Sequence, residues 1–253
     1  MKISINWIKE FVDLSGIDEK LLTERFNLAT AEIEDVEYKG KETYGVVFGK
    51  ILSVENVEGS DHLHKLLVDV GSEKLQIVCG APNVRVGMTT CVAKVGGCVC
   101  GKKIGNAKLA GVESFGMCCS ERELDLGADD DGIMDLEGDY VLGKDIKEEW
   151  PVDDIVFEVD NKSLTNRPDL WGHYGMAREF SVIFDRPLKP LEKLDLTKFD
   201  GLKKIDINVE SENCYRYSAI SVDNVTVKKS PMTMKIRLNY CGMRDINLLA
   251  DIT

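Results

Sequence analysis

The sequence has no hydrophobic run as long as a membrane span, and its start, Met1–Trp7, lacks the apolar core of a signal peptide. No two cysteines have the Cys-x-x-Cys spacing of common zinc and redox sites. Bases are also scarce: 32 lysines and arginines against 44 aspartates and glutamates give a net charge of −12. These absences favour a cytoplasmic protein without a membrane segment, and the charge argues against a wholly basic, histone-like nucleic-acid binder.

Cysteine itself is plentiful. The chain has 8, and six of them lie between residues 79 and 119 in apolar or glycine-rich surroundings. A reducing cytosol keeps such thiols free. We interpret them as small core hydrophobes, because a chain of 253 residues can bury a sizeable core without cross-links.

Two pairs of residues suggest metal binding or catalysis. His62 and His64 would share one face of a strand, but no third zinc ligand accompanies them at a recognisable spacing. Cys118 and Cys119 are adjacent, so on a strand they would point to opposite faces, and no nearby histidine could activate a thiol. We therefore expect an exposed strand start for the histidines and packing for the thiols, with no catalytic residue and no metal ligand in the chain.

Helical and extended patterns occur in two separate stretches. Residues 1–39 predict a short strand, two helices and a second extended segment, with Asp18 as the N-cap of the second helix. Residues 151–190 return to this mixed character: Ile155–Val159 alternates like a strand, and a helix is predicted to end near Asp185.

Residues 40–150 have a different pattern of apolar residues. Short apolar runs separated by glycines replace the helical periodicity, which predicts a small closed β-barrel. The oligonucleotide/oligosaccharide-binding (OB) barrel is one such architecture.

Charge is divided unevenly within residues 40–150. Leu75–Val112 has no acid and five bases, whereas Glu113–Asp139 has ten acids and one base, so an acidic protein can still present a basic surface.

The last part of the chain follows a segment, residues 187–200, whose prolines and charges are typical of a linker. Ile205–Val209 and Tyr215–Val222 are predicted strands. Ser230-Pro231 is predicted to begin a helix, and Leu248–Thr253 resembles part of another strand. We expect this third region to be incomplete.

Three segments of the central region carry a family resemblance. They are similar to the tRNA-binding OB module appended to several aminoacyl-tRNA synthetases, and Ser114-Phe-Gly-Met117 is their most specific piece. The sequences Val78-Cys-Gly-Ala-Pro-Asn83 and Cys118-Cys-Ser-Glu-Arg-Glu-Leu124 narrow the resemblance to the β chain of bacterial phenylalanyl-tRNA synthetase. The segments are Gly59–Gly71, Ile77–Arg85 and Lys108–Met117.

The resemblance extends nearly from end to end. Outside the central region it is carried by Met1–Leu14, Phe157–Asp160, Thr165–Asp169, Gly175–Glu179, Tyr215–Val222, Ser230-Pro231 and Gly242–Thr253. The family's β chain is much longer, so the chain resembles a truncated N-terminal portion.

The resemblance implies an α+β multidomain fold. An OB-fold tRNA-binding barrel, residues 40–150, would be inserted in a small discontinuous α/β domain, residues 1–39 and 151–190. Residues 200–253 would begin an α/β editing-type domain that is incomplete here.

The implied function is that of the N-terminal part of the β subunit of phenylalanine–tRNA ligase, an aminoacyl-tRNA synthetase. Such a part would support ATP-dependent attachment of phenylalanine to its tRNA through tRNA binding and subunit architecture, and would be inactive alone. ATP and magnesium would serve the complete enzyme, an α2β2 assembly with the α chain, and this segment would bind no cofactor, membrane or DNA. The alternatives are a free-standing OB-fold tRNA-binding protein without a catalytic partner and a scaffold whose barrel binds protein.

Six residues are predicted to contact tRNA: Arg85, Lys94, Lys102, Lys103, Lys108 and Ser114. Lysine and arginine neutralise phosphates, and a serine hydroxyl can bond the RNA backbone. The alternative is that the bases only keep a barrel rim solvated. Aromatic residues are sparse around them, so we expect recognition of the shape and phosphates of folded tRNA rather than base stacking. Five phosphate contacts would give a log–log salt slope of about −3.5.

A second polar group, Asn166, Arg167 and Asp169, lies at a predicted helix start. Arg167 could contact RNA or another domain. The interpretation that we favour is capping together with a buried salt link that ties this loop to residues 1–39.

Overall fold

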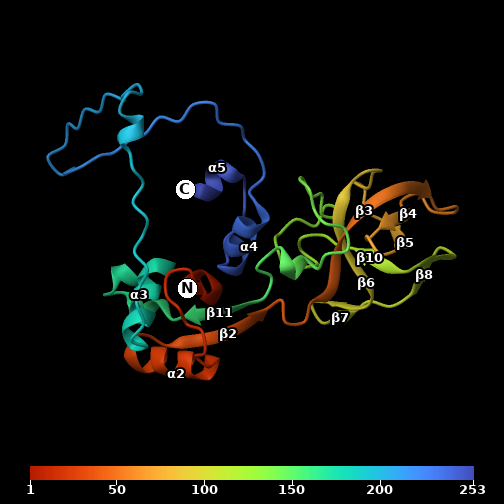
Figure 1. The fold of residues 1–253 in the computed structure, drawn as a ribbon, viewed down its shortest axis with the longest axis horizontal. Helices are drawn as coiled ribbons and strands as arrows, with labels where there is room; N and C mark the ends of the chain where they lie inside the picture. The colour runs from red at the N-terminus through yellow and green to blue at the C-terminus, as the bar shows by residue number, and fades with distance from the viewer.

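The computed structural model describes residues 1–253, a mixed α/β chain whose sheets are antiparallel (Figure 1). The first sheet has three strands in the order β1 (Lys2–Ser4), β11 (Asp154–Val159), β2 (Ile33–Lys39). Because β11 pairs with both neighbours, two stretches separated by more than a hundred residues meet in one sheet.

Three helices pack around this first sheet: α1 (Ile5–Lys9), α2 (Glu19–Ala29) and α3 (His173–Ile183). The Asp18 carboxylate accepts a hydrogen bond from the Lys20 amide at 2.9 Å, which confirms it as the N-cap of α2. Phe26 of α2 and Phe180 of α3 are fully buried and stack with their ring centroids 5.1 Å apart. This apolar layer fixes both helices on the sheet.

The second sheet, which we call the curled sheet, has six strands. Its main order is β10-β6-β3-β4-β5, and β7 pairs with the end of β6. The short hairpin β8–β9 lies beside it. The strands of the curled sheet and of this hairpin are, in chain order, β3 (Tyr44–Asn56), β4 (His64–Asp69), β5 (Lys74–Cys79), β6 (Thr89–Val99), β7 (Lys102–Lys103), β8 (Ala107–Leu109), β9 (Val112–Ser114) and β10 (Gly116–Cys118).

Hydrogen bonds join the two outer parts of the curled sheet. The Phe115 amide donates to the carbonyl of Gln76 in β5 at 2.8 Å, and the Gln76 side-chain amide donates to the Glu113 carbonyl at 2.8 Å. The sheet therefore curves round its own core, which includes Phe48 and Ile77.

The cysteines of this region divide into buried and accessible groups. Cys91, Cys98, Cys118 and Cys119 are buried among apolar side chains, which confirms the core interpretation for these four. Cys79 and Cys100 differ from it: Cys79 is half-buried and Cys100 is exposed. All eight thiols of the chain are free.

Gly40 makes the turn between the two sheets. Its φ is +72°, and a Cβ there would lie 2.5 Å from the Val152 carbonyl oxygen, so only glycine fits. The sheets also share side chains, because Val156 of β11 belongs to a core cluster of the curled sheet while its neighbour Phe157 belongs to the core of the first sheet.

The chain ends with two helices, α4 (Met232–Tyr240) and α5 (Leu248–Ile252). The predicted helix after Ser230-Pro231 is thus confirmed. Buried Tyr240 of α4 donates its hydroxyl to the Val152 carbonyl at 2.7 Å, so α4 packs where the two sheets meet. The remaining helical turns are of the 3-10 type: η1 (Ile146–Glu148), η2 (Asn161–Leu164), η3 (Pro168–Leu170) and η4 (Thr197–Phe199).

Three predicted strands are wrong. Ile205–Val209 and Tyr215–Val222 belong to no sheet, and their apolar side chains are exposed. An alternating pattern makes a strand only when a neighbouring strand accepts its backbone hydrogen bonds, and this structure provides none there. Leu248–Thr253 contains helix α5, because the Asn247 side chain accepts hydrogen bonds from the Leu249 and Ala250 amides at its start.

None of the helices combines the length and the apolar character that crossing a membrane requires.

Candidate nucleic-acid interface

Three of the predicted RNA contacts are exposed lysines without an ion-pair partner. Lys102 and Lys103 form β7, and Lys108 is the middle residue of β8. No carboxylate lies within ion-pair distance of their ammonium groups. These lysines keep their full charge toward solvent and can attract phosphates.

The other two predicted bases are already paired with acids. The Arg85 guanidinium donates to both carboxylate oxygens of Asp135 at 2.9 Å. Lys94 lies 2.5 Å from the Glu73 carboxylate. Either base would have to exchange an acid for a phosphate before it could contribute to RNA binding.

The five bases do not lie on one rim. Arg85 comes just before β6, whereas Lys102 and Lys103 pair with Val99 and Cys98 at the far end of this 11-residue strand. The length of β6 therefore separates Arg85 from Lys102 and Lys103, and Lys94 lies within the strand. The unpaired lysines of the basic stretch are those of β7 and β8.

Ser114 is buried, with 2% of its surface exposed. Its hydroxyl accepts a hydrogen bond from the Val78 amide at 3.0 Å and donates to the Gly116 carbonyl at 3.1 Å. The first bond holds β5 against β9, and the second fixes the turn from β9 into β10. The position does not suit the direct RNA contact predicted for it, because the hydroxyl is inside the protein and already bonded.

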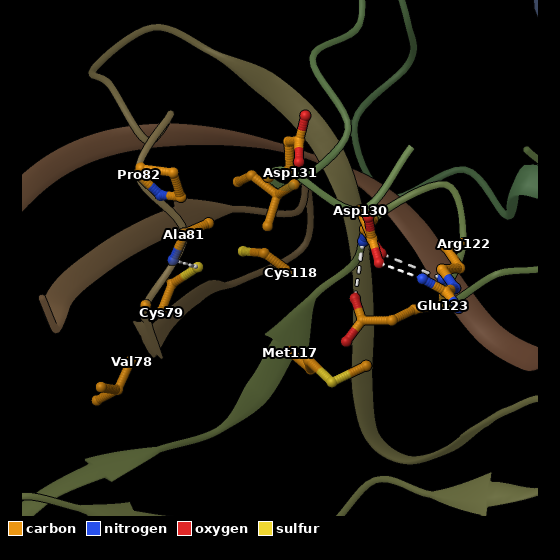
Figure 2. Close-up of a pocket in the computed structure, with 14 residues that line it drawn as sticks. Val78, Cys79, Ala81, Pro82, Met117, Cys118, Arg122, Glu123, Asp130 and Asp131 are labelled. Carbon is orange, nitrogen blue, oxygen red and sulfur yellow. Dashed lines mark hydrogen bonds and ion pairs between the residues drawn. The ribbon is translucent and has the colours of Figure 1, made fainter. Parts of the chain in front are cut away.

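A hollow of about 630 Å³ lies at the end of β5, and Figure 2 shows the side chains that line it. The sequence motifs that carry the family resemblance meet there: Val78–Pro82 forms one side, and Met117, Cys118 and the Ser120–Glu123 turn form the other. The turn is fixed by reciprocal bonds, since the Ser120 amide donates to the Glu123 carboxylate at 2.8 Å and the Glu123 amide donates to the Ser120 hydroxyl at 3.1 Å. The sequence shows each motif but not that they form one site.

The mouth of this hollow is acidic. Glu123, Asp130 and Asp131 line it together with a single base, Arg122, which pairs with Asp130. This excess of carboxylates repels phosphates. The RNA backbone is therefore better matched by the lysines of β7 and β8 than by the hollow.

The two thiols in the hollow are protonated at neutral pH. Burial raises the pKa of Cys118 well above its usual value, and burial likewise raises that of Cys79. A thiol is nucleophilic as its thiolate. The interpretation of Cys118 as a packing residue, rather than a nucleophile, fits its environment.

Arg167 takes part in an ion-pair network and not in an open basic surface. It donates to Asp169 at 3.0 Å and to Glu179 at 2.9 Å, and Glu179 accepts a hydrogen bond from Thr30 at the end of α2. The network ties the loop to residues 1–39, as the favoured interpretation states, but the capping that it also includes is wrong, because no side-chain hydrogen bond caps η3. The network is half-exposed, however, because the Arg167 side chain keeps 38% of its surface accessible.

The grouping of carboxylates closest to a metal site is Asp35, Glu37 and Glu158 on the first sheet. Lys2 and Lys39 both pair with Glu37, so one of the three carboxylates is already engaged by cations of the chain itself. His64 begins β4, and its Nδ1 lies 3.1 Å from the Asn56 side-chain oxygen.

Comparison with known proteins assigns a class to the curled sheet. Residues 46–145 match a domain family described as "Putative tRNA binding domain". This range includes β7 and β8 with their unpaired lysines, the acidic hollow, and buried Ser114. The chain thus contains a tRNA-binding type of domain.

Along its whole length the chain is similar to part of phenylalanine–tRNA ligase β subunits. It is 35% identical over 253 residues to the β subunit of Leptospira biflexa and covers 32% of that protein. It is 40% identical over 261 residues to the β subunit of Solibacter usitatus and covers 31% of it; each alignment takes in 100% of this chain. The chain spans about a third of the length of these curated relatives.

Two solved structures are also similar, at a level too low to support an argument. The MetRS related protein from Pyrococcus horikoshii is 22% identical with a TM-score of 0.30, covering 43% of this chain and 88% of that protein. The C-terminal domain of Plasmodium vivax p43 is 20% identical with a TM-score of 0.24, covering 28% of this chain and 42% of that one.

Proposed function

We propose that the chain acts as the RNA-binding and architectural N-terminal part of the β subunit of phenylalanine–tRNA ligase. The observation that supports this most strongly is that Lys102, Lys103 and Lys108, three exposed lysines without an ion-pair partner, lie within residues that match a domain of the tRNA-binding type in an acidic chain. Homology along the full length to β subunits of that ligase favours this role over a free-standing tRNA-binding protein.

The complete enzyme would attach phenylalanine to its tRNA at the expense of ATP, in the cytoplasm. In this proposal the α chain, in an α2β2 assembly, carries that reaction together with ATP and magnesium.

The fold supports a division into three units. We propose that the curled sheet is an OB-fold barrel, residues 40–150, inserted into a discontinuous α/β domain of residues 1–39 and 151–190. The pairing of β11 with both β1 and β2 supports this arrangement. Residues 200–253 would begin an editing-type domain.

RNA would be held by its backbone at β7 and β8. The ammonium groups of Lys102, Lys103 and Lys108 would each replace a counterion on a phosphate of folded tRNA, which makes affinity fall with salt. Arg85 and Lys94 would be secondary contacts, because Asp135 and Glu73 compete for them. The acidic hollow would face away from the phosphates.

Replacing Lys102 and Lys103 with alanine tests this proposal. We expect tRNA binding to weaken about 20-fold at ~0.1 M salt and the salt slope to become shallower by about 1.4, since two phosphate contacts are lost. Filter binding of a tRNA transcript specific for phenylalanine, measured over a salt series, gives both values.

The matched control is the double variant Lys193→Ala with Lys204→Ala, which removes the same charge from exposed residues outside the curled sheet. Equal weakening in both double variants would show that only net charge matters. Absence of salt-dependent tRNA binding by the unmodified chain would refute the RNA role and favour a protein-binding scaffold. Co-purification of a separate α chain distinguishes the ligase subunit from a free-standing tRNA-binding protein.

A further inference from the structure

A second hollow, of about 470 Å³, lies where the first sheet meets the curled sheet. Four lysines line it: Lys9 at the end of α1, Lys39 at the end of β2, Lys41 just after the Gly40 turn, and Lys147 in η1. They come from three separate places in the sequence, since only Gly40 separates Lys39 from Lys41, so no run of bases marks them. All lie outside the basic stretch Leu75–Val112.

Two of these lysines are held in place by contacts within the hollow. The Lys147 ammonium donates to the Gly40 carbonyl at 2.9 Å and to Asp153 at 2.6 Å. The Lys41 ammonium lies 4.5 Å from the centroid of the Tyr38 ring, a cation–π contact that orients it without neutralising it.

The acids of this hollow balance only part of its positive charge. Asp153 pairs with Lys147, and Lys39 is paired with Glu37 and Asp125. Asp154 is engaged by the chain itself, because its carboxylate accepts hydrogen bonds from the amides of Asn6 at 2.9 Å and Ile155 at 2.8 Å.

Lys9 and Lys41 remain, both exposed and both without an acidic partner. The hollow thus offers two free ammonium groups in a protein whose net charge is −12.

This hollow adjoins the basic edge of the curled sheet. The Gly101 amide donates to the Glu42 carbonyl at 3.1 Å, and the Cys100 amide donates to the Thr43 hydroxyl at 3.1 Å. Figure 1 shows β7 next to the segment that leads from β2 into β3. Lys41 and the pair Lys102–Lys103 are therefore on neighbouring turns.

We propose that this hollow is a second phosphate-binding site, in which Lys9 and Lys41, with Lys147 beside them, hold the backbone of the same tRNA that β7 and β8 contact. The inference rests on the proposed RNA-binding function. It adds Lys9, Lys41 and Lys147, which all lie outside residues 46–145, the range that matches the tRNA-binding domain. The RNA would follow the surface from the curled sheet across the Gly40 turn to α1. Recognition there is by charge and shape, since Tyr38 is engaged by Lys41.

The test is the double variant Lys9→Ala with Lys41→Ala in the 253-residue chain. We expect it to bind the tRNA transcript about 20-fold more weakly at ~0.1 M salt and to show a slope shallower by about 1.4. The variant Lys9→Arg with Lys41→Arg should bind within about twofold of the unmodified chain, because the charges stay in place.

The comparison variants are Lys193→Ala with Lys204→Ala and Lys102→Ala with Lys103→Ala. Suppose that Lys9→Ala with Lys41→Ala binds like Lys193→Ala with Lys204→Ala, while Lys102→Ala with Lys103→Ala binds more weakly. The second site is then refuted and the proposed function stands. If the unmodified chain binds no tRNA, both are refuted. An unchanged circular dichroism spectrum of each variant ensures that a loss of binding reports the site.

Discussion

Replacing Lys235 with methionine should lower the free energy of unfolding by about 3–5 kcal/mol. Lys235 of α4 is buried, with 5% of its surface exposed, and pairs with Glu121 at 2.5 Å and Asp245 at 3.1 Å. Burial acts to lower the pKa of Lys235, but the two carboxylates outweigh it and raise that pKa, so the ammonium stays charged. Removing it leaves the Glu121 carboxylate buried without its counter-charge.

Equilibrium unfolding in urea, followed by circular dichroism, measures this loss. Lys229→Met, an exposed lysine near the same turn, is the control and should change stability by less than about 0.5 kcal/mol. Adding Glu121→Gln to Lys235→Met should restore most of the loss, because the buried pair is then replaced by neutral groups. A Lys235→Met protein within about 1 kcal/mol of the unmodified chain would contradict this account of how α4 is held.

Acidification from pH 6.5 to pH 4 should remove about 3 kcal/mol of stability through His173. Burial, together with the nearby Arg237 charge, lowers the pKa of this histidine to about 4. The Ser4 amide donates to its Nε2 at 3.0 Å, and the Trp7 ring stacks on it with centroids 4.0 Å apart. Protonation would place a proton on the nitrogen that accepts the Ser4 bond.

The sign follows from the two states. The unfolded chain binds the proton near the ordinary histidine pKa of about 6.5, whereas the folded chain binds it near 4. The contribution of His173 is therefore complete above about pH 6.5 and is lost as the pH falls toward 4.

Urea unfolding of the unmodified chain and of His173→Gln at several pH values isolates this effect. The stability difference between the two proteins should shrink as the pH falls through this window, while exposed His62→Gln keeps the pH dependence of the unmodified chain. Parallel stability curves for the unmodified chain and His173→Gln would refute the assignment.

Local signals in the sequence predicted the first sheet and its helices well. The Asp18 cap and the apolar spacing of α2 act within a few residues, so the sequence alone contains them. The same is true of the alternation in β11. The motifs that identify the family likewise need no partner to be recognised.

What the sequence could not show depends on long-range pairing. The alternating residues of 205–227 predict strands, but a strand forms only when a second strand is present, and the chain leaves them exposed. The five bases of Leu75–Val112 looked like one surface, yet Arg85 and Lys94 meet acids about 50 and 20 residues away in sequence. Lys9 and Lys41 are far apart in the sequence and line one hollow only in the folded chain, so no sequence pattern marks them.

Amide hydrogen exchange of the chain with and without a phenylalanine-specific tRNA transcript tests the central claim most directly. Bound RNA should slow exchange in residues 100–109, which carry the unpaired lysines of β7 and β8, and leave residues 205–227 unchanged. Unaltered exchange in 100–109 under saturating tRNA would contradict the assignment of that edge as the RNA-binding surface.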